Sequence, residues 1–331
     1  MTSRERVKRC ISFSGPDRIP MGLPAPYPDD FQWAGQSGDP DWKPSRTWEI
    51  ENGAQWEDEW GNVWKRFDNT TRGEVIEGAL KDWSDLDNYK MPTYDKQFRY
   101  EKAKKTFEDK PDKYHLGGLP GFPFAIMRYM RLMEVFLADV LLYPDEVMRL
   151  QRMVIDHLKR CLDCWKWAGA DGVIFAEDWG TQERLLISPA LWRKMFRPGF
   201  EELVAHAHSL GIAMFHHCCG YIVDIIPDLR DLGMDVLQLD QPERSGIDFL
   251  RETVGGRVTI WSPVDIQWKL PKGNKADIQA AAKEYIEKLG SFNGGYMAGF
   301  YGDVKSLGIE KEWQMWACEA FAKYADSIYK K

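Results

Sequence analysis

The run His216-His-Cys-Cys-Gly220 carries the sharpest chemical signal in the chain. Imidazole nitrogen and thiolate sulfur are ligands that Zn²⁺ prefers in proteins. At the end of a strand, His217 and Cys219 point to the same side, because residues i and i+2 share a strand face. Asp240, after the next apolar segment, can add an oxygen ligand. The alternative is that a histidine orders the loop by hydrogen bonding and the cysteines are buried.

A pair of carboxylates, Glu177 and Asp178, follows another apolar segment. Adjacent strand residues point to opposite sides, so one of the two enters the site, and we expect it to be Asp178. Its carboxyl group can serve acid–base catalysis, or it can form a salt bridge or a helix cap. Asp265 and Gln267 share a face by the same rule, and either bind polar groups of a substrate or pair with Lys269.

These polar residues follow short apolar segments that alternate with amphipathic helices. Repeated strand–helix units without hairpin signals predict parallel strands joined by helical crossovers. Several such units in 331 residues favour an α/β fold of the (β/α)₈ TIM-barrel type over an open sheet. Because the strands of a barrel end at one mouth, their polar residues converge there. The strands are expected at residues 19–23, 115–118, 173–176, 212–215, 236–239, 258–261 and 295–298.

Two features of the predicted helices bear on the site. A helix is expected over residues 146–168, where Cys161 and Cys164 share one face. No second Cys-x-x-Cys and no histidine pair lies near them, so we interpret them as core thiols. The helix after Ser188 is expected to be interrupted at Pro198, because proline cannot continue a helical hydrogen-bond ladder.

Residues 24–113 lack helical periodicity and hold seven of the fifteen tryptophans. We expect a long, irregular, aromatic-rich excursion folded over the barrel mouth. Its rings are either core beneath a loop or an aromatic wall for a flat ligand. Neither a linker nor an internal repeat divides the chain, so residues 1–331 are predicted to form a single domain.

The composition narrows the class of protein. With 44 basic and 51 acidic residues the net charge is −7, and the absence of a basic block disfavours nucleic acid as the main partner. The most apolar stretch, Met133–Tyr143, is short and contains Glu134 and Asp139, so no membrane span is expected. The charged N-terminus does not resemble a signal peptide, and six cysteines without such a signal predict reduced thiols in a cytoplasmic protein.

Taken together, these motifs resemble the uroporphyrinogen decarboxylase superfamily, which implies a (β/α)₈ barrel with its site at the C-terminal mouth. The decarboxylases carry an Arg-Gln-Ala-Gly-Arg element after the first strand, whereas this chain has Met21–Pro26 without arginine. The segments that carry the resemblance are Asp17–Pro20, Ala176–Gln182, Ile187–Arg193, His217–Ile222, Gln241–Glu243 and Asp265–Gln267.

The corrinoid-dependent methyltransferase branch of that superfamily instead shows His-x-Cys-Gly, which His217, Cys219 and Gly220 match. This branch includes methylcobalamin:coenzyme M methyltransferases and O-demethylase methyltransferases. The resemblance implies zinc on the His and Cys, with an acidic ligand at a position similar to Asp240. A further cysteine, expected near residues 295–303, is missing here. The substitutes open to the chain are Tyr301, Asp303 and Glu177.

The function implied is methyl transfer between a small donor and the cobalamin of a partner corrinoid protein. Zinc would activate the heteroatom that carries the methyl group. The tryptophans favour a methoxylated aromatic donor, and a methylamine or a thiol such as coenzyme M fits the same barrel. A homodimer is compatible with this reading. The predicted catalytic residues are Asp178 and Tyr301, the predicted metal ligands are His217, Cys219 and Asp240, and the predicted substrate-binding residues are Trp179, Gln182, Asp265 and Gln267.

Two alternatives belong to other functional classes. One is a decarboxylase-like lyase without metal, in which Asp178 protonates a carbanion and a cation holds the substrate carboxylate. The candidate cations are Arg72, Arg128 and Arg184. The other is a non-catalytic protein on a decayed barrel that docks a corrinoid protein. Stoichiometric zinc would distinguish the methyltransferase hypothesis from the metal-free lyase hypothesis.

Overall fold

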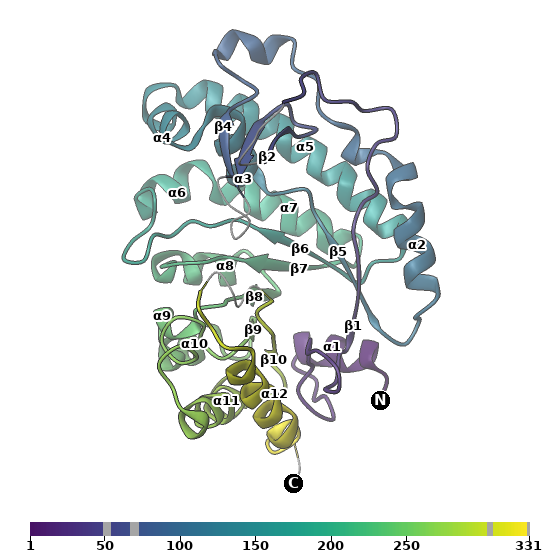
Figure 1. Cartoon of the computed structure of the whole chain (residues 1–331), viewed down its shortest axis with the longest axis vertical. Helices are drawn as coiled ribbons and strands as arrows, with labels where there is room; N and C mark the ends of the chain where they lie inside the picture. Colours follow the sequence, from purple (N-terminus) through teal and green to yellow (C-terminus); the bar gives the residue numbers. More distant parts are fainter. Residues whose placement is uncertain (49–53, 67–72, 303–306, 330–331) are drawn as a thin grey trace.

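The computed structural model describes residues 1–48, 54–66, 73–302 and 307–329. A seven-stranded sheet curls through the centre of the molecule (Figure 1). All of its neighbouring strands pair in parallel, in the order β1-β5-β6-β7-β8-β9-β10. The strands are β1 (Phe31–Ala34), β5 (Tyr114–Gly118), β6 (Gly172–Ala176), β7 (Ala213–His217), β8 (Val236–Gln238), β9 (Thr259–Ser262) and β10 (Tyr296–Ala298).

A short segment around Met21 links the two edges of this sheet. Met21 forms a parallel bridge to Ala298 on β10, and Gly22 forms an antiparallel bridge to Asp29, just before β1. The first of the expected strands, residues 19–23, is therefore a bridge rather than a full strand. The predicted α/β fold of the TIM-barrel type is confirmed.

Helices cover the outside of the sheet (Figure 1). Twelve α-helices lie in the described residues: α1 (Ser3–Ile11), α2 (Glu101–Glu108), α3 (Pro123–Arg131), α4 (Met133–Leu142), α5 (Pro144–Ala168), α6 (Pro189–Met195), α7 (Arg197–Ser209), α8 (Ile226–Asp231), α9 (Pro242–Ser245), α10 (Ile247–Val254), α11 (Lys275–Leu289) and α12 (Lys311–Tyr324). None of the helices in this part of the chain is both long and apolar enough to cross a membrane.

The helix after Ser188 starts and breaks for identifiable reasons. The Ser188 hydroxyl accepts a hydrogen bond from the backbone N–H of Leu191, and so caps the N-terminus of α6. The break lies at Phe196, between α6 and α7, rather than at Pro198 as expected. Pro198 lies in the first turn of α7, where a missing N–H leaves no helical hydrogen bond unmade.

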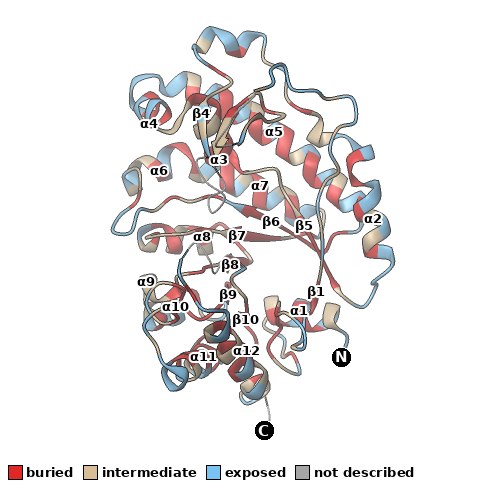
Figure 2. Ribbon diagram, viewed as in Figure 1, coloured by how far each residue is buried: buried red, intermediate tan, exposed pale blue. Residues whose placement is uncertain are grey.

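Two apolar cores follow from the alternation of side chains along the strands. Inward-pointing residues such as Phe215 and Val236 fill the barrel, and Val7 and Cys10 of α1 pack against them. Outward-pointing residues such as Met214 pack beneath the helices. The strands and the inner faces of the helices are accordingly buried (Figure 2).

The excursion over residues 24–113 is more regular than predicted. It contains the barrel strand β1, the helix α2 and an antiparallel sheet of β2 (Ala54–Glu57), β3 (Val63–Arg66) and β4 (Glu74–Glu77). Its tryptophans fasten it to the helices that follow β5. Trp64 packs on Tyr129 of α3 with ring centroids 4.9 Å apart, and Trp60 meets His157 of α5 edge-on. Three short 3₁₀ turns, Trp83–Asp87, Thr93–Asp95 and Gln97–Tyr100, complete the segment, and a fourth, Val223–Ile225, precedes α8.

Candidate functional site

A cavity of about 870 Å³ opens at the C-terminal ends of the barrel strands. Four of its lining residues lie side by side on neighbouring strands, because Ala176 pairs with His217, His217 with Gln238, and Gln238 with Trp261. Each belongs to the inward-pointing series of its strand. The cavity is also lined by Leu23, which is close to the Met21 bridge, and by the segment after β10, including Phe300 and Tyr301.

Three side chains with metal-binding atoms converge beside this cavity, and His217 is the one of the three in its lining. One ligand atom each from Asp178, His217 and Cys219 lies within 4.8 Å of the others. The Cys219 Sγ is 3.4 Å from the His217 Nε2, and the Asp178 Oδ1 accepts a 2.7 Å hydrogen bond from the Cys219 backbone N–H. All three residues are half-buried. Oxygen, nitrogen and sulfur donors in this arrangement fit zinc with a fourth position left for a ligand.

The loops that carry Asp178 and Cys219 are held together by close backbone packing. Gly220 has φ +79°, and a Cβ at this position would lie 2.5 Å from the Gly180 carbonyl oxygen. The Tyr221 backbone N–H donates to the Thr181 carbonyl at 2.8 Å. A side chain at residue 220 would therefore separate the two loops and move two of the three donor groups apart.

Asp240 lies outside the group formed by Asp178, His217 and Cys219. Its carboxylate Oδ1 accepts a 2.8 Å hydrogen bond from the Gln238 side-chain N–H. The Gln238 Oε1 in turn lies against the His217 Nδ1. Asp240 lines the cavity. Among the described residues, however, the carboxylate that lies close to His217 and Cys219 belongs to Asp178. The ligand set predicted from the sequence and the set assembled in the structure thus share His217 and Cys219.

His216 faces away from the cavity. Its ring stacks on Phe175 with centroids 4.9 Å apart, and its Nε2 donates to the Glu177 carbonyl at 3.1 Å. Burial lowers the pKa of His216 to about 4, so the ring is neutral. His217 is therefore the histidine that faces the site, a choice the sequence left open.

Glu177 also points away, toward the N-terminus of α3. Its carboxyl group accepts hydrogen bonds from the backbone N–H of Ala125 at 3.2 Å and from the Trp179 Nε1 at 3.0 Å. Burial raises the pKa of Glu177 to about 8 despite these donors. Asp178, as the strand alternation predicts, is the member of the pair at the mouth. Glu177 does not replace the missing cysteine ligand in this geometry.

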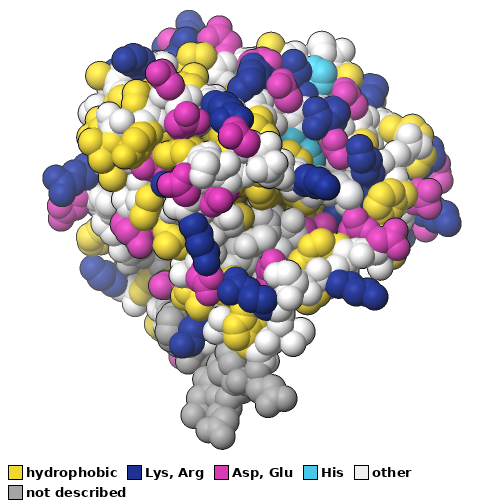
Figure 3. Space-filling model, turned by 90° about the horizontal axis from the view of Figure 1, so that it is seen from above, with side chains coloured by type: hydrophobic (Ala, Val, Ile, Leu, Met, Phe, Trp, Pro, Cys, Tyr) yellow, Lys and Arg dark blue, Asp and Glu magenta, His cyan; other side chains and the backbone are white. Residues whose placement is uncertain are grey.

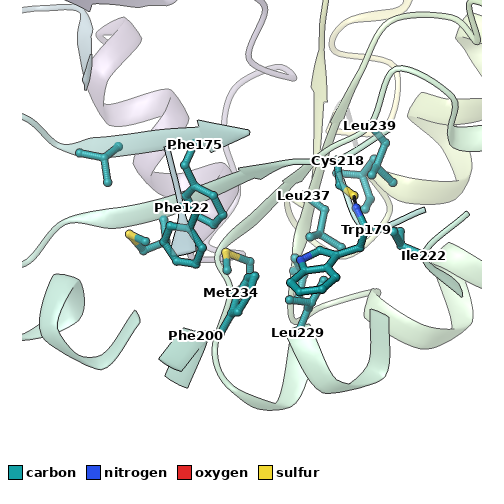
Figure 4. Packing of buried hydrophobic residues seen from close by; sticks show 14 of the residues in the cluster. Phe122, Phe175, Trp179, Phe200, Cys218, Ile222, Leu229, Met234, Leu237 and Leu239 are labelled. Atoms are coloured by element: carbon teal, nitrogen blue, oxygen red, sulfur yellow. Dashed lines mark hydrogen bonds between the residues drawn. The ribbon is translucent and has the colours of Figure 1, made fainter. Parts of the chain in front are cut away.

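Cys218 and Trp179 belong to the apolar layer between strands and helices. The Trp179 backbone N–H donates to the Cys218 Sγ at 3.4 Å, and both side chains point into a cluster with Leu237 and Leu239 (Figure 4). Trp179 is fully buried and stacks on Phe124. It has no surface to offer a substrate.

The other predicted substrate-binding residues also lie outside the cavity lining. Asp265 is buried, and its carboxylate accepts hydrogen bonds from the backbone N–H groups of Glu243, Gln267 and Trp268. Gln182 is exposed and accepts a 2.8 Å hydrogen bond from Arg244. Asp265 and Gln267 thus order the loop after β9. Tyr301 does line the cavity.

Cavity residues that the sequence reading missed are Gln238, Asp29 and the aromatic pair Trp33 and Trp261. The ring centroids of the two tryptophans lie 5.7 Å apart, and Trp33 is 46% exposed. Strand parity was a usable signal for Gln238, because it lies two residues before Asp240. No comparable signal distinguishes Trp33, which is one of seven tryptophans in an aperiodic segment.

Arg128 and Arg184, two of the three arginines proposed to hold a substrate carboxylate, do not line the cavity. Arg128 donates to the Tyr129 hydroxyl at 3.2 Å and lies over the Phe124 ring. Arg184 is exposed on the loop after β6. Arg72 and Asp303 lie outside the described residues. On the face seen in Figure 3, Lys and Arg are interspersed with Asp and Glu rather than gathered into a basic field.

Comparisons with known proteins agree with this architecture. The sequence model of the family described as uroporphyrinogen decarboxylase (URO-D) matches residues 68–300, more than two thirds of the chain, so the chain belongs to this family. No curated protein matches the sequence.

Among solved structures, a methyltransferase from Methanosarcina mazei is similar with a TM-score of 0.63 and 18% identity, covering 82% of this chain and 77% of its own. A D-psicose 3-epimerase from Clostridium cellulolyticum H10 is similar with a TM-score of 0.41 and 12% identity, covering 74% of this chain and 87% of its own.

Proposed function

We propose that this member of the uroporphyrinogen decarboxylase family is a methyltransferase that moves a methyl group between a small donor and the cobalamin of a partner corrinoid protein. The observation that carries the proposal is the group formed by Asp178, His217 and Cys219 beside the cavity. A nitrogen, a sulfur and an oxygen donor within 4.8 Å of one another suit a metal that activates a heteroatom. The fold shared with a methyltransferase is consistent with it.

Zinc held by these three residues would polarise the oxygen, nitrogen or sulfur that carries the methyl group and make it a better leaving group. When the methyl group departs from an ether oxygen, the bonding electron pair stays on that oxygen. The oxygen then needs a proton. Tyr301, in the cavity lining, is the proposed donor of that proton, and Asp178 orients the Cys219 segment through its backbone hydrogen bond.

The cavity suits a small donor with an apolar, flat portion. Trp33 and Trp261 are too close to admit a ring between them, so they form one aromatic wall, with the exposed Trp33 at its outer end. A methoxylated aromatic compound is the donor we propose, with methylamines and thiols such as coenzyme M as the compounds to compare with it. The lyase alternative finds less support, because the described lining residues include no Lys or Arg to hold a carboxylate.

The first test is metal content. Wild-type protein is expected to bind about one zinc per chain, and His217→Ala/Cys219→Ala is expected to lose it. The matched control is His206→Ala/Cys164→Ala, which removes the same two residue types from helices α7 and α5, away from the cavity. This control is expected to keep its zinc.

The second test is turnover. Methoxylated aromatics, methylamines and thiols are each mixed with the zinc-loaded protein and cob(I)alamin, and the cobalamin absorption spectrum is followed. Loss of the cob(I)alamin spectrum with one donor class and not with the double variant supports the proposal. A wild-type protein that binds no zinc, even when zinc is supplied, refutes the metal-activated mechanism and moves the lyase reading to first place.

A further inference from the structure

We propose that Gln238 is a positioning residue that fixes the tautomer of His217. In the tautomer proposed, His217 carries its proton on Nδ1 and presents the lone pair of Nε2 to the position between Cys219 and Asp178. This inference rests on the proposed metal site and adds to it a residue outside the group of Asp178, His217 and Cys219 that acts through His217.

The orientation of the Gln238 amide follows from its partner on the far side. Asp240 has an acceptor-only carboxylate when ionised, and its Oδ1 lies 2.8 Å from the Gln238 Nε2. The amide NH₂ group must therefore face Asp240. The amide oxygen then faces His217, and because that oxygen only accepts, the His217 Nδ1 must carry the proton.

A neutral imidazole with its proton on Nδ1 has a lone pair on Nε2. The His217 Nε2 is the ring nitrogen on the metal-binding side, 3.4 Å from the Cys219 Sγ. Protein metal sites commonly use this arrangement, in which the ligating histidine donates its other N–H to an oxygen acceptor. Here the acceptor is an amide whose own orientation is set by a carboxylate.

The backbone fixes the contact rather than leaving it to a loop. His217 is the last residue of β7, Gln238 is the last residue of β8, and the two are paired in the sheet register. Asp240 is 7% exposed, so little water competes for its hydrogen bond to the amide. The carboxylate, amide and imidazole thus form a relay between two neighbouring strand ends, prepared before any metal binds.

The test measures the tautomer directly in metal-free protein. Ring ¹⁵N NMR of His217, assigned with His217→Gln, is expected to show protonation at Nδ1 in the wild type. Gln238→Leu removes the acceptor, and the proton is expected to redistribute toward Nε2. Asp240→Asn supplies both a donor and an acceptor, so the Gln238 amide is free to rotate and the tautomer is expected to become mixed.

Zinc affinity, measured by competition with a chelating dye, gives a second readout. Gln238→Leu is expected to weaken zinc binding by about 10- to 100-fold, the usual effect of removing such an acceptor. The control is Gln279→Leu, which removes a surface glutamine whose side-chain N–H donates to Glu319 at 3.1 Å, far from the mouth. It is expected to leave both the tautomer and the affinity unchanged.

Protonation at Nε2 in the wild type, or a Gln238→Leu protein that keeps both tautomer and zinc affinity, overturns the inference. The tautomer measurement needs neither metal nor corrinoid. A wild type that shows the Nδ1 proton, loses it in Gln238→Leu, but binds no zinc would keep the relay and refute the proposed methyl-transfer site, so the two failures are distinguishable.

Discussion

Replacing Glu177 by Gln should change how the stability of the metal-free protein depends on pH. The carboxyl group is fully buried beside α3, and burial raises its pKa from about 4.5 to about 8. In the unfolded chain it ionises near pH 4.5. Between these values the folded state binds the extra proton, so the free energy of unfolding falls as pH rises through this window.

The magnitude follows from the two pKa values. Each pH unit in the window costs about 1.4 kcal/mol. At pH 7 the wild-type carboxyl group therefore costs about 3 kcal/mol of stability. Gln removes this titration but leaves an amide NH₂ without a demonstrated acceptor, which costs about 1–3 kcal/mol at every pH. The sign at a single pH is thus less informative than the slope.

His216 has the opposite effect on the pH dependence of stability in the same pH range. Burial lowers its pKa from 6.5 to about 4, so the unfolded chain binds more protons there and stability rises with pH between these values. The two effects nearly cancel between pH 4.5 and 6.5 in the wild type. Of these two effects, only that of Glu177 remains above pH 6.5, and it lowers stability as pH rises.

The assay is urea unfolding of both proteins between pH 4.5 and 8. The stability difference, Glu177→Gln minus wild type, is expected to grow by about 2 kcal/mol from pH 4.5 to 6.5 and by about 1.5 kcal/mol from pH 6.5 to 8. Taking the difference removes the titrations common to both proteins. A difference that stays constant across the range would refute the view that Glu177 is neutral in the folded protein at pH 7.

Three further predictions concern the loops, the barrel base and the cavity wall. Gly220→Ala is expected to cost about 3 kcal/mol or more in urea unfolding, because φ is +79° and a Cβ meets backbone; Gly35→Ala, with open space around it, should cost far less, and equal losses would contradict the packing argument. Burial alone would raise the pKa of Asp171, but hydrogen bonds from Arg4, Lys8 and the His115 backbone N–H together outweigh it, and the pKa is lowered. These contacts of Asp171 therefore stabilise the fold above the unfolded pKa, and the stabilisation is lost as pH falls through the folded pKa. Asp171→Asn should lower the free energy of unfolding by about 1–3 kcal/mol at pH 7 and weaken the loss of stability at acidic pH. An unchanged loss at acidic pH would contradict this argument. Trp33→Ala should raise the KM for an aromatic donor by about 10-fold with zinc content unchanged, and an unchanged KM would remove Trp33 from the binding surface.

The sequence predicted the later strands closely because their signals are local. The apolar segments at 173–176, 212–215 and 236–239 became β6, β7 and β8 within one or two residues. Each is bounded by glycine or by polar residues at the barrel mouth. The segment before residue 113 offered no such signals. β1 is four residues long, and its place in the barrel depends on pairing with β5, more than eighty residues later.

The alternation of side chains along a strand predicts which face each candidate residue occupies, but not which other side chains it contacts. The i, i+2 rule correctly separated Asp178 from Glu177 and joined His217 to Cys219, because alternation depends on the backbone alone. Parity could not choose between Asp178 and Asp240, which both point inward at the mouth.

That choice depends on what lies between the side chains. Gln238 fills the space between His217 and Asp240, whereas the contact of Gly180 with Gly220 draws the Asp178 loop onto Cys219. A glutamine two residues before the carboxylate makes Asp240 a partner of the amide, and two glycines with room only for hydrogen make Asp178 a neighbour of the thiol. The candidate ligand set is thus determined by Gln238, Gly180 and Gly220, which lie outside it.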